Sequence, residues 1–375
     1  MTDLRSNMAP PESLRLVDQV SSLRRSLARQ NIRVADMSRA GSLEMRIGSL
    51  PPAIDRPGES VVPLKIERLE GPIRQRRVEG DTSRHSMFRY FLDGSQKTIP
   101  ICRVGLAPVI VGLSAAGILY RETGQQPSLL GDSLRLNQAW IVPRSTGDPQ
   151  LEELIREIER TGGHIIDPLT DASGERHRAY HTLVGDYGKL LTHAYEIAGQ
   201  IRAAQERDVL QEWAETTGRT DPDHWIVVDG RLLPNVRNAV GVVKELLTQH
   251  LGGPEAVSLF DLPQGHRTTA FRYVSAFGER DQDGVPSPSN ARTMWYMRLW
   301  GATGMDARHS LVRIETAHEI DSTDQIDEIS RWILAERLPR PTDDPRWPTL
   351  LYPIHYLERI LKRRLAEVTT GWPSA

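Results

Sequence analysis

The chain has 375 residues, of which 39% are hydrophobic and 26% are charged, and this composition is typical of a folded globular protein. The length suits one large domain with an appendage, or two modest domains. The net charge of -2 argues against a uniformly basic protein that coats DNA, so any contact with nucleic acid would need a local basic surface.

The single cysteine, Cys102, excludes an internal disulfide and a cysteine-rich zinc site, and it fits a reducing compartment. The longest apolar stretch, residues 104–120, is short for a membrane span and contains Pro108, so it is predicted to be a buried strand. The N-terminus has acidic residues and no apolar core, so it does not resemble a secretory signal. We therefore expect a cytoplasmic protein with no membrane partner.

In the first third of the chain, apolar spacing predicts an amphipathic helix over residues 13–30. Residues 41–78 contain five prolines between short apolar runs, which is typical of a connector or a small irregular subdomain. Residues 87–96, 98–105 and 107–120 are predicted as three successive strands joined by tight turns.

Further along, helices are predicted over residues 148–161 and 180–215, the second with at most a light interruption. A buried strand over 224–229 follows, and residues 238–251 indicate a strand or turn that passes into a helix. Two more strands are predicted within 292–300 and 309–317, and a final helix over 352–367. Early strands followed by helices between later strands predict an α/β or α+β domain.

Two similar segments, FLDGS at 91–95 and VVDGR at 227–231, each place an aspartate before a glycine. Carboxylates at the ends of neighbouring strands can converge, and Mg²⁺ and Mn²⁺ prefer the oxygen ligands that would assist phosphodiester cleavage. Asp93 and Asp229 are therefore candidate metal ligands. The alternative for each is a plain Asp-Gly turn. For Asp229, the apolar run before it would make an unpaired carboxylate costly, which favours a functional role.

These segments belong to an ordered set: FLDGS, IRAAQERDVLQEW, WIVVDGRLLP, VGVVK, MWYMRLW and LVRIET. Together they resemble the NurA nucleases, over roughly residues 89–365. The resemblance implies an α/β fold with an RNase H-like mixed sheet flanked by helices. It also implies Mn²⁺- or Mg²⁺-dependent endo- and exonuclease activity on DNA, a homodimeric ring, and docking onto a hexameric HerA-like ATPase.

By the same resemblance, residues 85–375 form the nuclease domain, and residues 1–84 remain as a helical and Pro-rich extension that we expect to dimerise or to dock a partner. Asp93 and Asp229 match the family's two metal-binding aspartates. The acidic helix position between them matches Glu206, with Glu212 as the alternative register. Lys244 matches a lysine that would meet a phosphate. Its alternative is a solvated lysine at the start of a helix.

Strand alternation places pairs of polar side chains on common faces. Arg313 and Glu315 share one face, and they either pair with each other or contribute to the site. Tyr296 and Arg298 share another, and they either stack on and grip single-stranded DNA or make a cross-strand packing contact.

The family's late motif is a proline-led helix start that carries a histidine near the metals. Pro353 and His355 resemble it, but the histidine comes earlier than the motif requires, and Ile360 stands near the expected place. His355 is therefore either a metal ligand from another register or a helix cap.

No phosphate-cradling GxxxxGK[ST] loop occurs in the chain, so ATP hydrolysis would belong to another protein. The predicted function is metal-assisted hydrolysis of DNA by Asp93, Glu206 and Asp229, with Lys244 steadying the phosphate, in DNA end processing or in anti-phage defence. Two rivals remain: a non-catalytic adaptor that guides DNA into an ATPase ring, and an RNA-directed RNase H-like enzyme.

Overall fold

A computed structural model describes most of the chain. The described residues are 16–32, 34–36, 66–80, 86–122, 125–144, 147–170, 175, 180–221, 223–233, 236–244, 250–274, 291–344 and 346–372.

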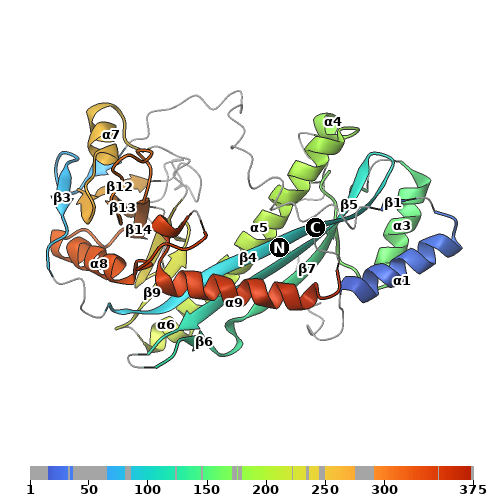
Figure 1. Ribbon diagram of the computed structural model, residues 1–375, viewed down its shortest axis with the longest axis horizontal. Coiled ribbons are helices and arrows are strands. Elements are labelled where there is room, and N and C mark those ends of the chain that lie inside the picture. The colour runs from blue at the N-terminus through green and yellow to red at the C-terminus, as the bar shows by residue number, and fades with distance from the viewer. Residues whose placement is uncertain are drawn as a thin grey trace, which may run out of the picture.

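One large mixed sheet forms the centre of the molecule (Figure 1). Its main path runs β2 (Ile66–Arg68), β12 (Phe271–Val274), β13 (Ala291–Arg298), β14 (Leu311–Ala317), β10 (Ala239–Val243), β9 (Trp225–Asp229), β4 (Phe88–Val104), β5 (Ala107–Tyr120), β7 (Arg135–Ile141) and β8 (Ile165–Ile166). Beside this path lie β1 (Ala35–Asp36), β3 (Gln75–Arg77), β6 (Ser128–Leu129) and β11 (His266–Thr268). Strands β4, β9 and β10 are parallel, and the antiparallel strands β5 and β14 flank them.

Helices cover both faces of this sheet, which confirms the predicted α/β class with a mixed sheet flanked by helices. They are α1 (Leu16–Arg29), α3 (Pro149–Arg160), α4 (Tyr180–Leu183), α5 (Tyr187–Glu215), α6 (Thr217–Thr220), α7 (Gly253–Phe260), α8 (Thr323–Glu336) and α9 (Tyr352–Val368), with the 3-10 turns η1 (Gly131–Ser133) and η3 (Trp347–Thr349). Helices α5 and α9 both pack against the β4–β5 hairpin. Over the described ranges, none of these helices has the length and apolar character needed to cross a bilayer.

The two long helices lie over opposite faces of the hairpin, because successive strand side chains point to opposite faces. Phe91 and Val227 belong to the apolar cluster that contains Leu357 of α9. Their neighbours, such as Leu92, belong to a separate cluster with Trp213 of α5. Odd-numbered residues of β4 near the site therefore face α9, and even-numbered ones face α5.

The prediction of three strands over 87–120 is wrong, because β4 and β5 are two long strands. Strand β4 passes straight through Asp93 and Gly94, which pair with Gly117 and Ala116 of β5. A continuous ladder on β5 holds the glycine in the strand, so this Asp-Gly pair is not a turn. The only irregularity of the hairpin is a register shift after Pro100.

The helices predicted over 13–30, 148–161, 180–215 and 352–367 agree closely with the structure where it describes them, while the helix predicted within 238–251 falls mostly on residues outside the described part of the chain. The interruption of residues 180–215 falls between α4 and α5, and Asp148 caps α3 through its side chain. Helix α1 buries Leu16, Val20 and Leu23 in the main core beside α3. Strands β1, β2 and β3 pair with strands that lie beyond residue 85, while residues 37–65 are outside the described part of the chain.

Candidate metal centre

Asp93 and Asp229 come from neighbouring parallel strands. Phe91 pairs with Val227 and Leu92 with Val228, so the next residue on each strand is an aspartate. By the alternation of the two strands, both carboxylates point to the face that α9 covers. Asp93 is buried, with 4% of its surface exposed. The sequence prediction that these two residues converge therefore agrees with the strand register.

Lys244 forms an ion pair with Asp229. It follows β10, which is parallel to β9, and its Nζ lies 2.6 Å from Asp229 Oδ2. The lysine side chain is only 11% exposed. Gly230, with a φ of 117°, turns the chain away after Asp229, so this Asp-Gly pair does end a strand. The alternative of a solvated lysine does not fit this ion pair.

Burial and surrounding charge disfavour ionisation of Asp93. Its pKa is raised well above the ordinary value, first by burial and then by the carboxylates of Asp229, Glu206 and Glu358, while Lys244 opposes the shift. The Gly94 amide donates a hydrogen bond of 2.8 Å to Asp93 Oδ1. A further cation beside Asp93 would stabilise its ionised form.

Glu206 approaches this centre from the opposite face. It lies on α5, and its Oε1 is 2.0 Å from the position that a Cβ on Gly94 would occupy. Arg202, one turn earlier, donates to the same oxygen at 2.9 Å. Burial, followed by the charge of Asp229, raises the pKa of Glu206 despite Arg202. The alternative, Glu212, is 60% exposed and pairs with Arg135, so Glu206 is the residue that the fold brings to the centre.

Glu358 is an acidic residue that the sequence analysis missed. It lies on α9, on the face of the sheet to which Asp93 points, and it contributes to the raised pKa of Asp93. Arg346 and Lys362 each approach Glu358 Oε1 to 2.8 Å. Burial opposes the charge of Glu358, but these two hydrogen bonds outweigh it and lower the pKa.

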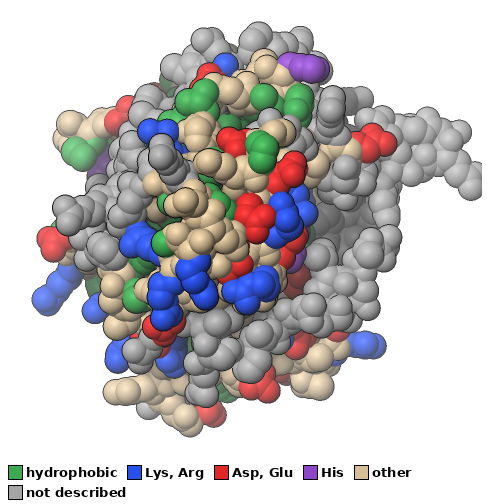
Figure 2. All heavy atoms as spheres, turned by 90° about the vertical axis from the view of Figure 1, so that its right-hand side faces the viewer, with side chains coloured by type: hydrophobic (Ala, Val, Ile, Leu, Met, Phe, Trp, Pro, Cys, Tyr) green, Lys and Arg blue, Asp and Glu red, His purple; other side chains and the backbone are tan. Residues whose placement is uncertain are grey.

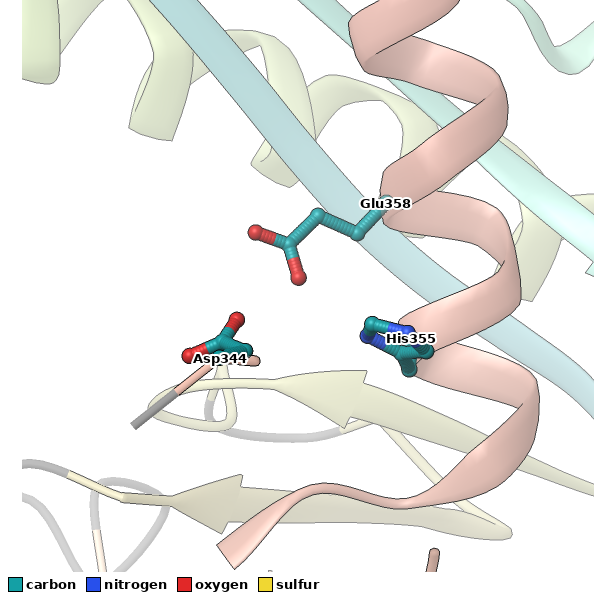
Figure 3. Close-up of side chains that lie close together, drawn as sticks. All are labelled: Asp344, His355 and Glu358. Carbon is teal, nitrogen blue, oxygen red and sulfur yellow. The ribbon is translucent and has the colours of Figure 1, made fainter. Parts of the chain in front are cut away.

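His355 does not join the predicted carboxylates. It comes together with Asp344 and Glu358, and the potential ligand atoms of these three residues lie within 4.8 Å of one another (Figure 3). In the described part of the chain this is the one such group of three, so Asp93, Glu206 and Asp229 are not as tightly gathered. The capping alternative for His355 does not fit either, because the N-cap of α9 is Leu351.

Tyr296 and Arg298 lie inside the protein, with 1% and 2% exposure. Tyr296 stacks on Phe271. Arg298 donates hydrogen bonds to the backbone carbonyls of Phe260, Leu262, Ala307 and His309. Their burial leaves no surface on which DNA could stack, so the packing alternative fits the structure.

Arg313 and Glu315 pair with each other at 2.8 Å and are both almost fully buried. Glu315 also accepts a hydrogen bond of 3.1 Å from the Leu232 amide, just after the strand that carries Asp229. The ion pair therefore holds the segment that follows Asp229, through the hydrogen bond from Leu232. Arg313 has no exposed surface for DNA.

No protein-family model matches the chain, and a search of curated proteins finds no significant match.

Proposed function

We propose that the chain is a divalent-metal-dependent deoxyribonuclease of the NurA type, with Mn²⁺ or Mg²⁺ as its cofactor. The observation that carries this proposal is the side-by-side placement of Asp93 and Asp229 on one face of two parallel strands, with Lys244 at 2.6 Å from Asp229. Two carboxylates next to a basic group are suited to a metal-assisted reaction on a phosphodiester.

The chemistry of the residues fits such an ion. Asp93 and Asp229 offer oxygen donors, which Mg²⁺ and Mn²⁺ prefer. Burial raises the pKa of Asp93 and neighbouring carboxylates add to the effect, while Lys244 only partly opposes it. When bound, the ion would activate the attacking water and offset charge on the phosphate.

The protein's own residues would position the substrate and the ion. Strand β5 pairs with Asp93 itself, and β9 pairs with the residues just before it. Lys244 would exchange its contact with Asp229 for a phosphate oxygen once the ion holds that carboxylate. Glu206 lies behind Gly94, where it adds negative charge without blocking the α9 face.

The partner proposals rest on the resemblance to the NurA nucleases. They are DNA, a second copy of the chain in a homodimer, and a hexameric HerA-like ATPase that would drive DNA end processing or anti-phage defence. Exposed arginines of α1, namely Arg24, Arg25 and Arg29, offer a basic surface to an acidic partner. Figure 2 views the end of the molecule where α1 and α3 lie, and basic side chains gather in its lower half beside acidic ones.

The experiment is Mn²⁺-dependent cleavage of end-labelled linear DNA by the purified chain, with and without a HerA-like ATPase. Cleavage by the wild type is compared with cleavage by a double variant that carries Asp93→Asn and Asp229→Asn. Asp148→Asn is the matched control, because asparagine caps α3 as well as aspartate does. We expect cleavage by the wild type and the control, and none by the double variant.

Other outcomes favour the rival functions. No cleavage by the wild type, even with the ATPase, would support the non-catalytic adaptor. Equal cleavage by the double variant would place the chemistry elsewhere. Matched RNA and RNA–DNA hybrid substrates complete the test, because a preference for the RNA strand of the hybrid would support the RNA-directed enzyme.

A further inference from the structure

Helix α9 and the segment before it bring an imidazole and two carboxylates together outside the pair Asp93 and Asp229. His355 and Glu358 are three residues apart, so they lie on the same face of α9. Asp344 comes from the loop that precedes η3. Figure 3 shows the three side chains around a common space, with Asp344 facing the helix.

The distances suit a single ion once the ligands move closer. Ligand atoms of Asp344, His355 and Glu358 lie within 4.8 Å of one another. Ligand atoms that bind one metal tetrahedrally at about 2.1 Å lie about 3.4 Å apart, so the widest of these separations has to close by at most about 1.4 Å.

His355 provides the second indication. Its Nδ1 is buried and has no hydrogen-bond partner among the described residues. A buried ring nitrogen without a partner is costly, because it has lost water and gained nothing in exchange. A divalent ion bound at Nδ1 would remove this cost, because the nitrogen would then have a partner.

We propose that Asp344, His355 and Glu358 form a second cation site that takes a divalent transition ion of the Zn²⁺ or Co²⁺ type. One imidazole and two carboxylates favour these ions over Mg²⁺ or Ca²⁺, which prefer oxygen ligands alone. The ion ties the first turns of α9 to the loop at Asp344. The proposal does not depend on nuclease activity, because ion binding is measured without DNA.

Arg346 fills this site when no ion is bound. Its Nη2 lies 2.7 Å from Asp344 Oδ2 and 2.8 Å from Glu358 Oε1, so one guanidinium nitrogen bridges two of the proposed ligands. About half of the Arg346 side chain is exposed, so it can turn into solvent. A divalent ion would then replace one positive charge with two between the same oxygens. Arg346 therefore competes with the ion, and its removal should strengthen binding.

In the experiment, Co²⁺ alone is titrated into the metal-free full-length chain. Binding is measured by calorimetry and by the visible absorption of bound Co²⁺. It is repeated in the Asp93→Asn and Asp229→Asn background, which lacks the other candidate centre. In the Asp93→Asn and Asp229→Asn background we expect one Co²⁺ that His355→Gln weakens at least about tenfold and Arg346→Gln tightens by a similar factor. The unmodified chain should bind this Co²⁺ and a further one at Asp93 and Asp229. Arg359→Gln, an exposed residue of the same helix, should leave binding unchanged.

Two results would overturn the proposal. One is the absence of Co²⁺ binding in the Asp93→Asn and Asp229→Asn background, which would assign all bound Co²⁺ to the other centre. The other is Arg346→Gln that fails to tighten binding, which would mean that Asp344, Arg346 and Glu358 form only an ion-pair network. If His355→Gln does not fold, the Arg346→Gln measurement alone decides, because it predicts a gain of affinity.

Discussion

Glu206 of α5 contacts Gly94 on the α5 side of the sheet, which is the side away from the Asp93 carboxylate. Because Glu206 Oε1 lies 2.0 Å from the place of a Cβ on residue 94, any side chain there must displace the carboxylate or the strand. Gly94 is not needed for a turn, since it lies inside β4. Its role is to leave room for Glu206 beside Asp93.

The first prediction concerns this contact. Gly94→Ala should lower the free energy of unfolding by roughly 1–3 kcal/mol, the usual cost of overpacking, as measured by urea denaturation. A Glu206→Ala change in the same chain should recover most of the loss, because the two effects share one contact. Gly117→Ala is the control, because its nearest neighbours are at 3.6 Å or more. Equal losses for Gly94→Ala and Gly117→Ala would contradict the assignment.

The second prediction concerns pH. A carboxyl group whose pKa is raised by folding binds a proton in the native state at a pH where the unfolded chain has released it. Stability therefore falls as pH rises from about 4, the unfolded value, to the raised pKa of Asp93. Asp93→Asn should remove this fall and raise the melting temperature at pH 7–8. A melting temperature that is lower for Asp93→Asn at that pH would show that the buried charge is well compensated.

The third prediction concerns Lys244. Lys244→Gln removes the cation that competes for Asp229, so Mn²⁺ should bind more tightly in calorimetry. If the chain cleaves DNA, the rate at saturating Mn²⁺ should nevertheless fall about tenfold or more, because the contact to the phosphate is lost. Lys189→Gln, an exposed lysine at the start of α5, should change neither. Weaker Mn²⁺ binding in Lys244→Gln would mean that the lysine positions Asp229 for the ion.

The fourth prediction separates packing from DNA contact at Arg298. Arg298→Gln leaves several buried carbonyl groups without donors, so the free energy of unfolding should fall by at least about 2 kcal/mol. The folded variant should keep its affinity for single-stranded DNA in a fluorescence anisotropy titration. A variant with full stability and lost DNA affinity would reinstate the DNA-gripping interpretation.

Much of the fold could be predicted because its signals are local. Helices α3, α5 and α9 follow from apolar periodicity and from caps such as Asp148, and β5 follows from its apolar run. The single strand through Asp93 could not be predicted, because Asp-Gly favours a turn locally and only the ladder with β5 overrides it. Pairing partners distant in sequence decide such cases.

In the candidate site, too, the placement of some residues could be predicted from the sequence and that of others could not. The placement of Asp93 beside Asp229 could be predicted, since both end apolar runs that pack as neighbours. The burial of Tyr296 could not, because alternation gives the face of a strand but not what covers it. The spacing of His355 and Glu358 was a usable signal, but the addition of Asp344 depends on how the loop returns to α9.

Asp93 lies inside the long pairing of β4 with β5, and this limits where residues can be inserted into or deleted from the chain. An insertion of one residue between Phe91 and Asp93 would exchange the two faces of β4, so the carboxylate would point toward α5 and an apolar neighbour toward α9. Surface loops tolerate insertions of varied length, but here only an insertion of an even number of residues would keep the carboxylate on the same face. Distant homologues should therefore keep the spacing from Phe91 to Asp93 even where the surrounding residues differ.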